Sequence, residues 1–114
     1  MNREKLCLTV RHVASLLEKE AYEELESLSQ GVRLSAEEMK EAIRSYGRKI
    51  TCFPEAACKE LDIVEVLGSN PKQWRINVPL FTESEGHSDL TLSVTLIESE
   101  TALHKIEIDD IHTL

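Results

Sequence analysis

Hydrophobic residues recur every three or four positions in the first half of the chain and every second position in the last third. Between residues 3 and 28 the apolar positions fall on one stripe of a helix: Leu6, Val10, Val13, Leu17, Ala21, Leu25 and Leu28. This spacing predicts one long amphipathic helix over 3–28. A second helix is predicted over 36–46, because Ser35 and Glu38 have the spacing of a capping box and Gly47 follows the last apolar turn.

The alternating pattern after residue 60 predicts four β-strands joined by short turns, over 61–67, 74–82, 89–98 and 103–111. Pro79 cannot donate a hydrogen bond to a ladder, so its strand is expected at a sheet edge or with a bulge. Residues 48–60 leave two alternatives open, a short helix that starts near Pro54 or a short strand or packed linker. Helices followed by a strand meander indicate a single α+β domain over 1–114, with the helices packed on a four-stranded antiparallel sheet.

Length and composition are those of one ordinary globular domain, since 41% of the 114 residues are hydrophobic and 30% are charged. No apolar run approaches the roughly 20 residues that span a bilayer, and the first residues lack a signal-peptide pattern, so we expect a cytoplasmic protein. The cysteines Cys7, Cys52 and Cys58 form no C-x-x-C pair. We expect all three to be reduced small hydrophobes, with a Cys52–Cys58 disulfide or a reactive thiol as the alternative.

The net charge of −8 is unevenly distributed. Residues 1–50 contain nine Lys and Arg against nine Asp and Glu, whereas residues 82–114 contain eight acids and the single base Lys105. The negative potential of the acidic last third disfavours nucleic acid and anionic membranes as partners. It favours a partner with a basic protein surface and would speed the association with that partner. If the meander gathers these acids, they form one contiguous patch.

Two polar clusters are candidates for chemistry. His87, Ser88 and Asp89 follow Gly86 in one loop, but a hydrolase triad needs side chains that converge from distant positions, so we expect turn and capping roles here. Asp110 and His112 share a face on a strand, which allows a carboxylate–imidazole pair, but we expect a solvated edge near the C-terminus instead. Adding His104 or His87 could make a metal site, but the spacings typical of metal ligands are missing.

The remaining sequence contains no nucleotide-binding glycine loop, no metalloprotease motif and no basic aromatic patch. His12, beside the apolar stripe of the first helix, is expected to be a boundary residue rather than a ligand. We therefore expect a binding protein, not an enzyme, without a cofactor or a metal.

The C-terminal half also resembles a known family. The resemblance rests on Trp74, on Val78-Pro79-Leu80-Phe81-Thr82, on Glu85-Gly86-His87-Ser88-Asp89-Leu90-Thr91-Leu92, and on the ending Ile108-Asp109-Asp110-Ile111-His112-Thr113-Leu114. It is similar to a family of small bacterial proteins of unknown function, in which an Arg is usual at the position of His87. The order of helices and strands resembles cystatin-like and nuclear-transport-factor-like folds.

Proteins of this kind resemble immunity proteins encoded beside polymorphic toxins, including those of contact-dependent growth inhibition. The resemblance implies a monomeric cytoplasmic protein that binds a toxin domain, often a basic nuclease, and blocks it. The expected contacts are the acids of the last third together with two aromatic anchors: Glu83, Glu85, Asp89, Glu98, Glu100, Glu107, Asp109, Asp110, Trp74 and Phe81. The main rival is a small-ligand-binding or enzymatic domain with a pocket between sheet and helices, and a third alternative is a self-assembling structural subunit.

Overall fold

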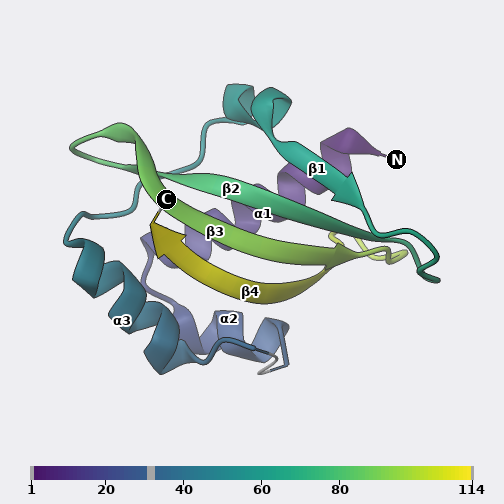
Figure 1. The fold of residues 1–114 in the computed structure, drawn as a ribbon, viewed down its shortest axis with the longest axis horizontal. Coiled ribbons are helices and arrows are strands. Elements are labelled where there is room, and N and C mark those ends of the chain that lie inside the picture. The colour runs from purple at the N-terminus through teal and green to yellow at the C-terminus, as the bar shows by residue number, and fades with distance from the viewer. Residues whose placement is uncertain (1, 31–32, 114) are drawn as a thin grey trace.

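A computed structural model describes residues 2–30 and 33–113. It contains the helices α1 (Arg3–Glu18), α2 (Tyr22–Leu28) and α3 (Ala36–Tyr46), a 3-10 helix η1 (Glu55–Glu60), and the strands β1 (Asp62–Glu65), β2 (Gln73–Thr82), β3 (Gly86–Ile97) and β4 (Lys105–Thr113). The strands form one antiparallel sheet in the order β1-β2-β3-β4. The α+β architecture expected from the sequence is therefore confirmed, with helices on a four-stranded meander (Figure 1).

The first helix is shorter than its apolar stripe predicts, and the single helix over 3–28 is wrong. The chain turns at Glu20, which adopts a left-handed conformation (φ 59°), and the amide of Ala21 donates back to the carbonyl of Leu16 over 2.9 Å. This helix end uses a glutamate where glycine is usual, so the sequence gives no stop signal there. The turn directs α2 away from α1 and toward α3 and β4.

The second predicted helix is confirmed together with its cap. The Ser35 hydroxyl accepts the Glu38 amide over 3.2 Å, and the Ser35 amide donates to the Glu38 carboxylate over 3.0 Å. Gly47 ends α3 in a left-handed conformation (φ 79°).

The core lies between α1 and one face of the sheet. In Figure 1, α1 passes behind the strands, and the opposite face of the sheet is turned toward the viewer without a helix over it. The core residues are aliphatic for the most part and include Leu6, Val10 and Leu17 of α1 and Ile76, Leu92 and Ile108 of the sheet. Within the described residues, no helix is both long enough and apolar enough to cross a membrane.

Two expectations about the segment before the sheet are resolved. Residues 55–60 form the 3-10 helix η1 directly after Pro54, and Ile50 and Phe53 pack in the core as a linker. Cys58 of η1 is bonded to Cys7 of α1 in a disulfide, with Cα atoms 5.7 Å apart, so the prediction of three reduced cysteines is wrong. The pairing joins residues 51 positions apart, which spacing alone could not reveal, and only Cys52 is an exposed free thiol.

The strands start and end within a few residues of their predicted bounds, except that β1 is shorter than 61–67. Pro79 lies past the end of β1, because the β1–β2 register reaches only Asn77, and a register shift follows it between Pro79 and Phe81. Both explanations offered for this proline therefore apply: locally β2 has no β1 neighbour, and it has an irregularity at that point.

Candidate functional site

The uncovered side of the sheet presents a connected layer of polar side chains, which we call the open face. Its polar members come from all four strands: Asp62, Arg75, Asn77, Thr91, Ser93, Thr95, Lys105, Glu107, Asp109, Asp110 and His112, with Val64 and Ile97 on the same face. They alternate along the strands with the buried core residues, as the pleat requires. The open face is therefore set by the same pattern that sets the core.

An irregularity in β4 places two consecutive carboxylates near each other. The register of β3 and β4 shifts between Ser93 and Val94, so that Asp110 pairs with Ser93 and Ile108 with Val94, and Asp109 is the extra residue. Neighbouring residues of a regular strand point to opposite faces, and a bulge relieves this rule. Asp109 consequently reaches Thr95 on the open face instead of pointing into the core.

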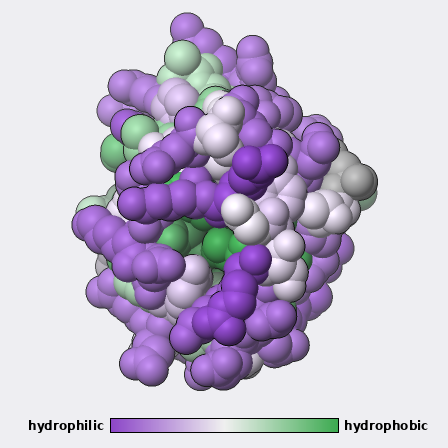
Figure 2. Space-filling view, turned by 90° about the vertical axis from the view of Figure 1, so that its left-hand side faces the viewer, coloured by the Kyte–Doolittle hydropathy of each residue, from purple (hydrophilic) through white to green (hydrophobic). Residues whose placement is uncertain are grey.

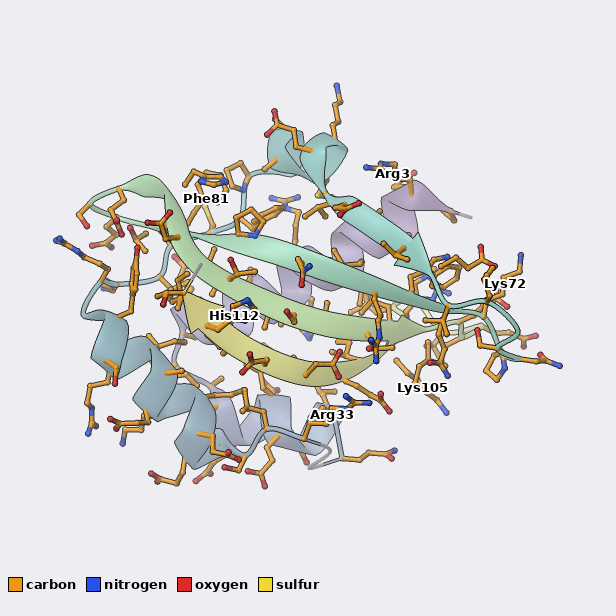
Figure 3. All side chains as sticks on the ribbon, viewed as in Figure 1. Arg3, Arg33, Lys72, Phe81, Lys105 and His112 are labelled. Carbon is orange, nitrogen blue, oxygen red and sulfur yellow. A yellow bond between two sulfur atoms is a disulfide. The ribbon has the colours of Figure 1, made fainter. Side chains whose placement is uncertain are left out.

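Asp109 is held by two partners from distant parts of the chain. The Thr95 hydroxyl donates to its Oδ2 over 2.6 Å, and Arg33 Nε lies 3.2 Å from its Oδ1. Figure 3 shows Arg33 beside β4, where it reaches from the segment between α2 and α3. The Asp109 side chain is only 15% exposed, so this charge is largely removed from water and paired.

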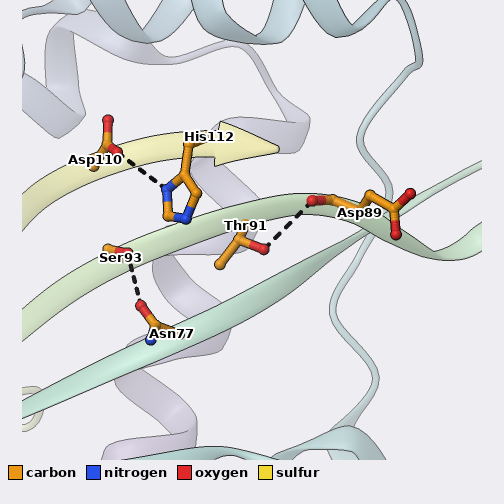
Figure 4. Close-up of polar contacts among 6 residues, drawn as sticks. All are labelled: Asn77, Asp89, Thr91, Ser93, Asp110 and His112. Atoms are coloured by element: carbon orange, nitrogen blue, oxygen red, sulfur yellow. Dashed lines mark hydrogen bonds and ion pairs between the residues drawn. The ribbon is translucent and has the colours of Figure 1, made fainter. Parts of the chain in front are cut away.

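Two further pairs lie on the open face: Figure 4 shows Ser93 and Asn77 joined across β3 and β2, and Asp110 and His112 joined along β4. The Ser93 hydroxyl is 2.7 Å from the Asn77 amide oxygen, and His112 Nδ1 is 3.0 Å from Asp110 Oδ2. The carboxylate–imidazole pair, the less expected alternative to a solvated edge, is thus present. His104 directly precedes this strand and lies eight residues from His112, roughly 26 Å at a strand's rise, so it cannot join the pair. The described residues contain no group of three or more His, Cys, Asp or Glu placed to hold a metal.

A hollow of about 340 Å³ lies in the middle of the open face. Its polar walls are contributed by Arg33, Asp62, Arg75, Asn77, Ser93 and Asp109. Thr91 and Thr95, although on the side of the sheet without a helix, are only 4% and 3% exposed. On a fully solvated strand face these two side chains would be exposed to water. Their low exposure therefore shows that neighbouring groups of the protein cover them.

The acids of the hairpin between β2 and β3 are engaged within the chain. Tyr46 of α3 donates its hydroxyl to the Glu85 carboxylate over 2.9 Å, and Glu83 lies 3.8 Å from Lys49. Thr82 also donates to Glu85, and the Asp89 amide donates to Tyr46. Glu85 therefore holds the hairpin against α3.

His87, Ser88 and Asp89, expected in a loop, belong to the start of β3, while the expected turn and capping roles are present, since the Ser88 hydroxyl accepts the Leu90 amide over 3.2 Å. Gly86 makes the turn with a left-handed backbone (φ 69°), and the Ser88 hydroxyl donates to the carbonyl of Leu80 over 2.7 Å. The His87 ring contacts Phe81 across the strands, with centroids 5.8 Å apart.

The acids of the last third do not form one contiguous patch, contrary to expectation. Glu83, Glu85 and Asp89 lie at the hairpin end of the sheet, while Glu98 and Glu100 lie in the loop between β3 and β4, at the other end. The 12 residues of β3 separate these ends, a length of about 36 Å at roughly 3.3 Å per residue. Only Glu107, Asp109 and Asp110 lie between them, on β4.

The two aromatic residues expected to anchor a partner, Trp74 and Phe81, differ in their exposure to solvent. Trp74 is 2% exposed and faces the core, so it presents no surface to a partner and is removed from the candidate contacts. Phe81 is partly buried near the hairpin end, where its ring packs edge-on against Phe53 with centroids 5.5 Å apart (Figure 3).

The basic residues of α3 gather elsewhere, around a hollow of about 240 Å³. Leu17, Ile43 and Ile50 provide its apolar lining. Its charged lining has a positive excess, with Lys40, Arg44, Arg48 and Lys49 against Glu18 and Glu20. Figure 2 views the molecule from the side on which α3 ends and shows a hollow with a hydrophobic floor inside a hydrophilic surface. A basic partner would be repelled from this end of the molecule.

Fold and site together define a small α+β protein with one helix-covered and one open sheet face. The chain belongs to the family "Domain of unknown function (DUF7668)", which it matches over residues 14–114. A search of curated proteins finds no match. A search of solved structures finds none either.

Proposed function

We propose that this protein works by binding another protein through the open face, and that the partner is a basic toxin domain which it neutralises as an immunity protein. The toxin, the immunity role and a cytoplasmic site of action come from the resemblance of the C-terminal half. The proposed mode of action is stoichiometric: the bound protein covers a basic groove of the toxin and excludes its substrate.

One observation supports the open face as the binding surface. The open face is the side of the sheet without a helix, and its polar groups are already paired before any partner arrives. Side chains that are ordered in the free protein lose little conformational entropy on binding, which favours affinity. Thr95 and Asp109 are held in this way although they face outward.

The charge of the protein supplies the second part of the proposal. Glu107 and Asp110 on β4 are not opposed by a Lys or Arg ion pair among the described residues, and the molecule as a whole carries −8. Such a field accelerates association with a basic surface by about 10 to 10³-fold at low salt. The cations around the end of α3 would orient the partner toward the sheet.

The protein encoded beside this chain's gene is the first partner to test, by calorimetry of the two purified proteins and by growth of cells that express both. The expected result is a 1:1 complex, protection of growth, and an association rate that falls as salt rises. Failure of the neighbouring protein to bind, or binding without protection, would contradict the immunity role.

Two charge reversals test the surface. Asp110→Lys and Glu100→Lys change the net charge equally, so both should slow association by long-range repulsion. Only Asp110 lies on the open face, and we expect its reversal to accelerate dissociation as well, by about tenfold or more. Equal effects on dissociation would place the contact elsewhere.

A further inference from the structure

The start of β4 holds a cluster of buried polar atoms without partners. His104 is 6% exposed and Trp74 is 2% exposed, with ring centroids 5.1 Å apart. Neither imidazole nitrogen of His104 has a hydrogen-bond partner, and Trp74 Nε1 has none. The other such atoms in the described part of the chain belong to Asp109 and His112, which are in ion pairs. Each unsatisfied group costs about 1–3 kcal/mol, so native proteins rarely retain one without water, an ion or a ligand.

His104 lines a hollow of about 250 Å³ between α1, α2 and the start of β4. The other walls include His12 of α1, Leu28 of α2, and Leu103 and Ile106 around the start of β4. These walls are mainly apolar. The hollow is smaller than the roughly 300–1,000 Å³ of typical small-molecule sites, so it fits only a ligand smaller than a typical drug.

The backbone beside the ring is fixed to α1. The His104 amide donates to the Thr9 hydroxyl over 3.1 Å, and that hydroxyl donates to the carbonyl of Lys5 over 2.8 Å. Thr9 is itself fully buried. The backbone of His104 is therefore held in place beside the hollow. Both ring nitrogens are buried from water, and when neutral the imidazole has one donor and one acceptor.

The local charge favours an anion. The Lys5 ammonium donates to the carbonyl of Ser99, which positions it in this region. Burial and then Lys5 lower the pKa of His104, and Glu98 opposes them more weakly. An environment in which a lysine outweighs a glutamate stabilises negative charge near the ring.

We propose that this hollow binds a small monocarboxylate with a short hydrocarbon body. The carboxylate accepts a hydrogen bond from the His104 imidazole, while Leu28, Leu103 and Ile106 contact the hydrocarbon. This site is distinct from the open face and does not depend on the protein partner.

Hexanoate is the probe, and 1-hexanol is its uncharged counterpart. Trp74 is the only tryptophan of the chain, so its fluorescence reports on the ring that packs against His104. We expect a saturable change with hexanoate and binding about tenfold weaker with 1-hexanol, the difference contributed by a charge-assisted hydrogen bond.

Matched variants locate the site, with binding measured by ligand-observed NMR. Leu28 and Leu8 are exposed to similar extents, 43% and 48%, and only Leu28 lines this hollow. Leu28→Phe should fill part of the hollow and weaken hexanoate binding about tenfold, whereas Leu8→Phe should change it by less than about twofold. His104→Phe should abolish the preference for hexanoate over 1-hexanol, with circular dichroism confirming that the variant is folded.

Each outcome of these experiments decides either the existence of the site or the class of its ligand. A response that does not saturate, or that Leu28→Phe and Leu8→Phe affect equally, overturns the site. Equal affinities for hexanoate and 1-hexanol overturn the assignment to carboxylates. Loss of toxin binding with an intact hexanoate response would refute the proposed function and leave this site standing.

Discussion

Reducing the disulfide between Cys7 and Cys58 should destabilise the protein substantially. The bond joins α1 to η1 across a sequence separation of 51 residues. In the chain-entropy treatment, closing a loop of that length in the unfolded state corresponds to about 4 kcal/mol at 25 °C. A domain of this size is typically stable by about 5–15 kcal/mol, so the loss is a large share of the total.

The assay is urea unfolding of the oxidised protein, the reduced protein and Cys7→Ser. With a typical urea dependence of about 2 kcal/mol per molar, the midpoint should fall by about 2 M in the last two samples. The reduced wild type keeps both sulfur atoms, so it separates the effect of the bond from that of the side chain. Cys52→Ser, at the exposed free thiol, is the control and should shift the midpoint little.

If the reduced protein and Cys7→Ser unfold at the same urea concentration as the oxidised protein, the bond contributes no constraint and the reasoning fails. An equal loss in Cys52→Ser would also refute it, because the effect would then belong to cysteine replacement in general. Mass spectrometry of the alkylated, unreduced chain identifies which thiols are bonded.

Three other perturbations have defined outcomes. Thr95→Val removes the hydroxyl that donates to Asp109 and should lower the unfolding free energy by about 1–2 kcal/mol in urea melts. Tyr46→Phe releases Glu85 at an exposed site and should cost about 1 kcal/mol or less, with faster amide exchange in the β2–β3 hairpin. For His104, stability should decrease as the pH falls below 6.5, and His104→Phe should remove that part of the decrease.

The sign of the pH effect follows from the lowered pKa of His104. Burial and Lys5 disfavour the charged imidazole in the folded state, and Glu98 only partly compensates. Below the ordinary value of 6.5 the unfolded chain therefore binds a proton that the folded chain does not, and acid favours unfolding. NMR titration of the ring gives the pKa directly. A pKa for His104 above the ordinary value of 6.5 would contradict the expected direction.

Local signals predicted much of the fold. The capping box at Ser35 and the alternation from Trp74 to Leu96 depend on neighbours in sequence, and the structure confirms both elements. The break at Glu20 was missed because the apolar stripe continues through it, and only tertiary packing of α2 distinguishes a bent helix from a straight one.

The candidate site was predictable only in part. Residues two apart share a strand face, so a pair of Asp110 and His112 could be foreseen as an alternative, and the structure contains it where a solvated edge was expected. Arg33 and Asp109 are 76 positions apart in the sequence, and their ion pair depends on the bulge in β4. No residue type in β4 indicates that bulge. The assumption that acids close in sequence form one patch failed because a meander sends successive loops to opposite ends of the sheet.

The most direct test of the account is an NMR footprint of the protein with its toxin partner. Amide signals are recorded for the free and bound chain, and the open-face strand residues Asn77, Ser93 and Asp110 are compared with Glu4 and Leu8 on the exposed side of α1. The account predicts shifts and protection along the centre of β2, β3 and β4, with α1 unchanged. A footprint on α1 or at the end of α3, with the open face unchanged, would contradict it.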